Sequence, residues 1–112
     1  MMNMLTKLEE LILLAVWKLG EGAYGTTIYR HLQSVTGKKL SLGGVYFPLD
    51  RLVKQGFLRV YSGPTTEERK GLSRRYYQLT EKGFEALHDI NRVNEIMWAG
   101  FGKASCSSGE SG

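Results

Sequence analysis

Apolar residues recur at helical intervals from the start of the chain. Thr6-Lys7-Leu8-Glu9 has the spacing of a capping box, in which side chains satisfy the unpaired donors at a helix start. Leucine, isoleucine, alanine and valine then recur three and four positions apart as far as Gly20, the expected left-handed cap. Leu13, Leu14 and Trp17 fall on other faces. This helix is therefore expected to be covered on most sides, either by a partner chain or by helices of the same chain.

A second helix is predicted from Tyr24 to Thr36, with Gly37 as its end. Its buried stripe is expected at Ile28, Leu32 and Val35. The first turn, Tyr24-Gly25-Thr26-Thr27, offers small and hydroxylated residues whose backbone donors suit a phosphate. Ordinary capping is the alternative interpretation of that turn.

A third helix is predicted from Ser41 to Gln55, with Ser41 as its N-cap. Pro48 costs such a helix one hydrogen bond, and the glycines at 43 and 44 leave the backbone room to adjust. Alternatively the helix begins only near Pro48, because proline favours a first helical position. The inward face is expected at Val45, Leu49 and Leu52.

Two strands follow, predicted over Phe57 to Tyr61 and Ser73 to Leu79, with a long polar loop between them. The resulting hairpin has a basic tip, which is typical of a wing that contacts DNA. A solvated hairpin whose arginines serve solubility is the alternative.

A final helix is predicted from Glu81 to about Phe101, capped by Thr80. Its apolar residues follow the three-four spacing of a coiled-coil seam, in which Asn94 would pair with its own copy. Residues 103–112 are rich in serine and glycine and are expected to be disordered. The residues expected to dimerise are Leu87, Ile90, Asn94, Met97, Trp98 and Phe101.

The positive charge of the chain is local. Seven Lys and Arg lie between Arg51 and Arg75 against two acids, Glu67 and Glu68, which gives +5 in a chain whose total is +4. A helix followed by a basic hairpin suits a polyanion, and its shape fits duplex DNA.

The remaining composition narrows the class of protein. A single cysteine, Cys106, rules out an intrachain disulfide framework, and His31 and His88 lack ligand spacing, so no cofactor or metal is expected. No apolar run reaches the length of a membrane span, and we expect a cytoplasmic, nucleoid-associated protein. An enzyme is not expected, since the glycines at 43 and 44 lack the Lys and Ser or Thr of a phosphate-binding loop.

The order of three helices, basic hairpin and long helix is that of a winged helix-turn-helix with an added C-terminal dimerisation helix, a mainly α fold with a small β-hairpin. In this order and spacing the chain resembles the PadR-like transcriptional regulators over about Leu5 to Phe101. The matching pieces are Leu11-Ile12-Leu13-Leu14, Gly20, Tyr24-Gly25, Gly44-Val45-Tyr46, Pro48-Leu49, Arg51-Leu52, Gly56, Arg74-Arg75-Tyr76-Tyr77, Leu79-Thr80-Glu81 and Gly83.

The resemblance implies a homodimeric DNA-binding protein, usually a repressor, with a winged-helix domain over 1–79 and a dimerisation helix over 80–102. Phe47 departs from the family, which often has a small or polar residue there. The resemblance implies DNA contacts from the second helix start, the third helix and the wing: Tyr24, Gly25, Ser41, Gly43, Gly44, Tyr46, Lys70, Arg74 and Arg75.

A small aromatic effector is a further expectation from the resemblance. Trp17, Met97 and Trp98 would line an apolar pocket at the dimer centre, and a plain dimer core is the alternative. For the whole chain, the rival functions are a winged-helix module that binds protein and a non-specific architectural DNA binder.

Overall fold

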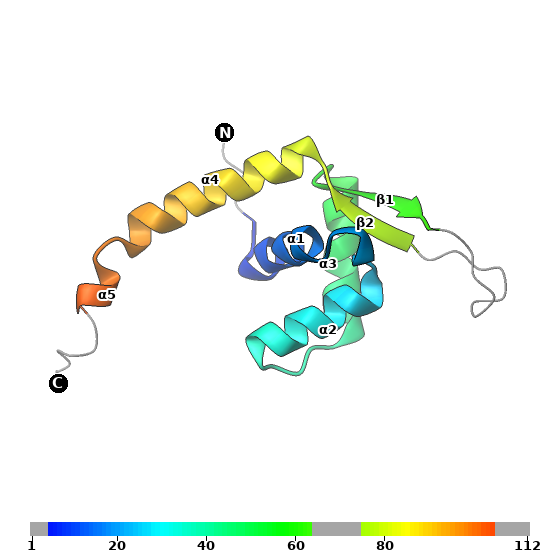
Figure 1. Ribbon diagram of the computed structural model, residues 1–112, viewed down its shortest axis with the longest axis horizontal. Helices are drawn as coiled ribbons and strands as arrows, with labels where there is room; N and C mark the ends of the chain where they lie inside the picture. The colour runs from blue at the N-terminus through cyan, green and yellow to red at the C-terminus, as the bar shows by residue number, and fades with distance from the viewer. Residues whose placement is uncertain (1–4, 64–74, 105–112) are drawn as a thin grey trace.

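The computed structural model describes residues 5–63 and 75–104. The first three helices pack together, the hairpin lies against one end of this body, and α4 runs away from it toward the C-terminus (Figure 1). The predicted winged helix is confirmed. The elements in chain order are α1 (Lys7–Leu19), the short 3-10 helix η1 (Gly20–Gly22), α2 (Gly25–Thr36), α3 (Leu42–Lys54), β1 (Leu58–Ser62), β2 (Arg75–Leu79), α4 (Glu81–Trp98) and α5 (Phe101–Ala104).

The core forms where α1, α2 and α3 meet the hairpin. The inward face predicted for α3 is confirmed, since Val45, Leu49 and Leu52 are fully buried. Val35 is a correction, because its side chain is 61% exposed, one turn beyond Leu32, the last residue of α2 in the buried core. The largest fully buried side chains are Ile12, Leu13, Ile28, Leu32, Val45, Leu49, Leu52 and Leu58.

The Glu9 carboxylate joins the start of α1 to the middle of α3. One oxygen accepts from the Thr6 backbone N–H at 2.9 Å, and the Thr6 hydroxyl accepts from the Glu9 N–H, which completes the predicted capping box. The other oxygen accepts from Nε and Nη2 of Arg51 at 2.9 and 2.7 Å. Glu9 is the one charged residue buried in the described part of the chain, and these two charge-assisted bonds to a single carboxylate oxygen help to compensate its loss of water.

The hairpin is antiparallel, with Leu58 opposite Leu79 and Ser62 opposite Arg75. The segment before α2 joins it as a minimal third strand. Tyr24 forms an isolated bridge with Tyr76, and the Tyr77 N–H donates to the Ala23 carbonyl at 2.8 Å. The sequence pattern did not predict this pairing, which attaches the start of α2 directly to the wing strand.

A tight corner connects the hairpin to α4. The Thr80 hydroxyl accepts from the Gly83 N–H at 3.1 Å, the predicted cap, and also donates to the Gly56 carbonyl at 2.6 Å. Gly83 is buried there, and a Cβ on it would collide with the Phe57 carbonyl oxygen. The corner therefore requires glycine at this position, because the backbone of α4 lies directly against the backbone of Phe57, the residue before β1.

Three predicted boundaries need correction. The α3 helix begins at Leu42 and continues through Pro48, so the alternative start near Pro48 is wrong. Gly20 has a φ of 58° but a ψ of −125°, which is not the left-handed helical cap. The α4 helix ends at Trp98, because Ala99 is extended and Gly100 has a φ of 83°. Phe101 therefore lies in a separate turn, and the predicted three-four seam does not run through one continuous helix.

We expect Glu9→Gln to destabilise the fold at neutral pH by about 1–3 kcal/mol, because it weakens charge-assisted hydrogen bonds to a buried group. Burial raises the pKa of the Glu9 carboxyl, but the Thr6 N–H and the Arg51 guanidinium outweigh it and hold that pKa below its ordinary value. A lowered folded-state pKa gives stability that is present above the unfolded pKa and is lost as the pH falls through the folded value.

The measurement is urea unfolding of both proteins from pH 7 to pH 3. The difference in unfolding free energy should shrink as the pH falls below about 4.5. A difference that stays constant across this range would contradict the role of the carboxylate charge. Glu81→Gln, on an exposed residue, is the matched control.

Candidate nucleic-acid interface

The α3 helix buries one side in the core and exposes the other. Its first turn is closed by Ser41, whose hydroxyl accepts from the Gly44 N–H at 2.9 Å. Ser41 and Gly44 are exposed, whereas Gly43 is half-buried. Phe47 is 74% exposed, on the side opposite the buried residues. The helix is therefore held by one face and offers the other, which is the arrangement a groove-binding helix needs.

The structure brings Tyr46 and Gly25 together, two residues that are predicted from the sequence as separate DNA contacts. Gly25 is buried at the start of α2, and a Cβ on it would overlap the Tyr46 ring and hydroxyl. The absent side chain thus makes the seat for the tyrosine, and α3 can approach α2 closely. Gly25 and Tyr46 set the angle between the two helices whatever else they contact.

Three tyrosine rings connect α2 to the hairpin. The Tyr24 ring meets the Tyr76 ring edge to face at 5.4 Å between centroids, and Tyr76 stacks on Tyr61 at 5.7 Å. At the same place the Tyr24 N–H donates to the Thr27 hydroxyl at 3.0 Å, which is one half of a capping box. This bond uses the N–H of the residue before the helix and not the N–H groups of its first turn, so capping and phosphate contact both stay predictions for this turn.

The predicted wing residues are only partly within the described chain. Arg75 begins β2 and is exposed, whereas Lys70 and Arg74 lie outside the described residues. Arg59 is exposed and donates to Gln78 across the hairpin at 2.9 Å. Arg51 pairs with Glu9, so the local excess of +5 falls to +4 when that carboxylate is included.

Exposed lysines near α3 were absent from the predicted site. Lys38 and Lys39 are exposed in the connection that precedes Ser41, and Lys54 is exposed at the last turn of α3. The signal was present in the sequence as a basic dipeptide just before an N-cap. A helix N-terminus attracts phosphate, so cations beside it strengthen the same preference.

A second surface follows α1 and α4. Leu87, Ile90 and Asn94 are half-buried, and the Asn94 amide donates to Glu10 at 3.3 Å, within the same chain. Met97, Trp98 and Phe101 are 75, 62 and 61% exposed, and the Trp98 and Phe101 rings meet edge to face. The predicted dimerisation residues therefore divide into a half that packs on α1 and a half that is open to solvent.

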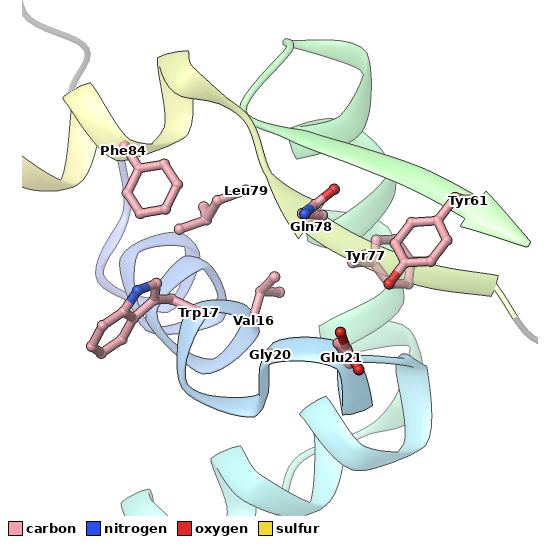
Figure 2. A pocket seen from close by; sticks show the side chains of 9 residues that line it. All are labelled: Val16, Trp17, Gly20, Glu21, Tyr61, Tyr77, Gln78, Leu79 and Phe84. Atoms are coloured by element: carbon pink, nitrogen blue, oxygen red, sulfur yellow. The ribbon is translucent and has the colours of Figure 1, made fainter. Parts of the chain in front are cut away.

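Trp17 lines two shallow hollows. The first, about 210 Å³, lies between the end of α1 and the hairpin, with Phe84 beside Trp17 and the Tyr61 ring at the far side (Figure 2). The second, about 290 Å³, lies between α1 and α4 and is lined by Leu14, Trp17, Phe84, Leu87, His88 and Asn91. Met97 and Trp98 line neither hollow, so the chain alone does not bring them to Trp17.

Residues 5–63 and 75–104 contain neither a candidate metal site nor a helix that could span a membrane. No cluster of three or more His, Cys, Asp or Glu residues could hold a metal ion. No helix in these ranges has the length and hydropathy to cross a membrane.

We expect Gly25→Ala to cost about 1–3 kcal/mol of stability, because the added methyl overlaps the Tyr46 ring. In a Tyr46→Ala background the same change should cost less, and the double-mutant cycle measured by urea unfolding gives the coupling. Gly22→Ala, where a Cβ meets nothing within 4 Å, is the control. Equal costs in both backgrounds would contradict the proposed seat.

Comparison with known proteins agrees with the winged-helix fold. The model of the transcriptional regulator PadR-like family matches residues 13–89, and no curated protein matches significantly. A PadR-like regulator from Bacillus cereus strain ATCC 14579 has a TM-score of 0.72 at 24% identity, covering 87% of this chain and 89% of that one, a likeness of fold.

Two further structures are similar. RosR of H. salinarum has a TM-score of 0.65 at 26% identity, covering 84% of this chain and 77% of that one. A PadR family transcriptional regulator from Eggerthella lenta DSM 2243 has a TM-score of 0.64 at 26% identity, covering 84% and 80%. A winged helix matched over most of its length by this family model supports DNA-binding transcription regulation. The chain belongs to the PadR-like family of transcriptional regulators.

Proposed function

We propose that the chain is a sequence-specific, dimeric repressor that binds a pseudo-palindromic operator through α3. The observation that carries this proposal is the exposed side of α3, together with exposed cations in the connection before it, Lys38 and Lys39, and on the hairpin, Arg75. The α3 helix would enter the major groove while the flanking cations contact phosphates. We expect the protein to act in the cytoplasm, on the nucleoid.

Contacts among the aromatic rings support the proposal that α2, α3 and the wing bind DNA together. Tyr24 packs on Tyr76, and Gly25 packs on Tyr46, so the start of α2 touches both the hairpin and the helix proposed to enter the groove. Ser41, Gly43 and Gly44 supply a first turn with little side-chain bulk. These residues would let the backbone of α3 approach DNA. Lys70, Arg74 and Arg75 would be the DNA contacts of the wing.

Apolar exposure supports the dimer. Four residues near the end of α4, Ile96, Met97, Trp98 and Phe101, are each more than 60% exposed. A single exposed apolar residue is ordinary, but a run of them marks an interaction surface. Two copies would pair through α4 and α1 and place their α3 helices about 34 Å apart, one turn of DNA.

Release by a small aromatic ligand is the regulatory part of the proposal. Trp17 and Phe84 line both hollows, so a planar compound there would touch α1, α4 and, in the first hollow, the hairpin. Titration of tryptophan fluorescence with planar phenolic and cationic compounds tests it, and no change with any compound would count against it.

The first test of the function is a pull-down of fragmented genomic DNA from the source organism, sequenced at moderate salt. A recovered palindrome with half-sites one turn apart is the expected result. Unselected DNA would instead indicate a non-specific architectural binder, and no DNA would favour a winged-helix module that binds protein.

Arg75→Ala should weaken binding to all duplexes alike and reduce the slope of log affinity against log salt by about one unit. Arg92→Ala, on the exposed side of α4, is the matched control and should leave the slope unchanged. An unchanged slope for Arg75→Ala, measured by fluorescence anisotropy from 50 to 300 mM salt, would remove this wing arginine from the phosphate contacts.

Met97→Glu should weaken the dimer at least ten-fold, because it buries a charge in an apolar interface. Val35→Glu makes the same change on another exposed apolar residue, on α2, and should leave the dimer intact. Sedimentation velocity across a concentration series measures both. A wild-type chain that stays monomeric at all concentrations, with or without DNA, would refute the dimer.

A further inference from the structure

The outermost line of α3 has an unusual chemical make-up for a helix that binds a DNA groove. Four residues one turn apart form this line: Gly43, Phe47, Asp50 and Lys54. Phe47 is at its centre, 74% exposed, across the helix from the buried Val45 and Leu49. The ring rests beside Gly43, at ordinary van der Waals distance from where a Cβ would stand.

This line is poor in the groups that usually identify bases by hydrogen bonding. Bidentate contacts to guanine or adenine need arginine, lysine, asparagine or glutamine, and only Lys54, at the last turn, is of that kind. Arg51 is on the same helix, but two of its donors are bound to Glu9. The charges of Asp50 and Lys54 cancel, so the line is also not a phosphate-binding surface.

The Phe47 ring is not required for packing within the described chain. Its exposure means that the fold gains little from burying it, and the residues that hold α3 in place lie on the other side. A single exposed apolar side chain is ordinary on a protein surface. Phe47 differs in its place, because it lies at the centre of the side of α3 that the proposed function turns toward DNA, so the apolar target that it suggests is a group on DNA.

We propose that Phe47 recognises the 5-methyl group of a thymine in the major groove, so that each half-site contains a thymine identified by apolar contact. The thymine methyl is the one apolar group on the major-groove edge of the four standard bases, and phenylalanine is among the residues that contact it. This inference rests on the proposed function and adds the chemical identity of the base contact.

The test uses the full chain and the duplex recovered in the pull-down. Each thymine is replaced in turn by deoxyuridine, which removes the methyl group and leaves the hydrogen-bonding edge unchanged. At one position in each half-site, the replacement should lower affinity about four-fold, which corresponds to one buried methyl group. Replacement at both symmetric positions should lower affinity roughly 15-fold.

Phe47→Ala should bind the thymine duplex more weakly and lose its preference for thymine over deoxyuridine at that position. Because the Phe47 ring is exposed, the urea midpoint of the Phe47→Ala variant should stay close to that of the wild type. A loss of DNA affinity in this variant would then reflect a lost DNA contact and not a loss of folding. Val35→Ala removes another exposed apolar side chain and should keep the full preference.

The outcomes distinguish the inference from the function beneath it. Specific binding that no deoxyuridine weakens would overturn the methyl contact while leaving the regulator intact. A thymine preference that survives in Phe47→Ala would overturn the assignment to this residue. Recovery of unselected DNA would overturn the proposed function, and this inference with it.

Discussion

The pairing of Glu9 with Arg51 fixes the position of α3, and most of the proposed interface depends on that position. A buried carboxylate is costly unless its oxygens are satisfied, and here one oxygen caps α1 while the other holds the guanidinium on α3. The start of α1 and the middle of α3 are thereby bound to the same carboxylate. Removing this pair leaves the apolar face of α3 intact, but the helix loses its polar contact with the start of α1.

The contact between Gly25 and Tyr46 holds α3 against α2. The tyrosine ring occupies the space that any side chain at 25 would fill, so α2 and α3 meet along a defined line. The Tyr24, Tyr76 and Tyr61 rings continue this order into the hairpin. The parts proposed to touch DNA are thus linked by close contacts between rings and a bare backbone, in addition to the apolar core that α2, α3 and the hairpin share.

Much of the fold could be predicted because it depends on local patterns. The buried face of α3 follows from apolar spacing, and the caps at Thr6, Ser41 and Thr80 follow from residue type. The missed features are contacts between distant residues. Glu9 and Arg51 are 42 positions apart, and the bridge at Tyr24 is too short to show a strand period. The end of α4 at Trp98 was missed because apolar spacing continues across Gly100.

The sequence indicated which region contains the candidate site, but not which contacts its individual residues make. Residue type indicated Ser41, Tyr46 and Arg75, but no pattern shows that Gly25 seats Tyr46 or that Arg51 is already bound. Val35 illustrates the reverse error, since a helical stripe predicts a face but not how far along the helix the neighbouring elements extend.

The corner at Thr80 has a mechanical consequence. The β2 strand passes into α4 with no linker, and the Thr80 hydroxyl and the buried Gly83 hold the junction against the end of α3 and the start of β1. The α4 helix is then an arm of about 27 Å, at 1.5 Å per residue, held at this corner and also against α1 through the hydrogen bond from Asn94 to Glu10. A tilt of one degree at the corner moves the far end by roughly 0.5 Å. In a pair of such chains, the distance between the two α3 helices would be set by an angle, and small changes of that angle would alter which spacing of sites along DNA the pair can span.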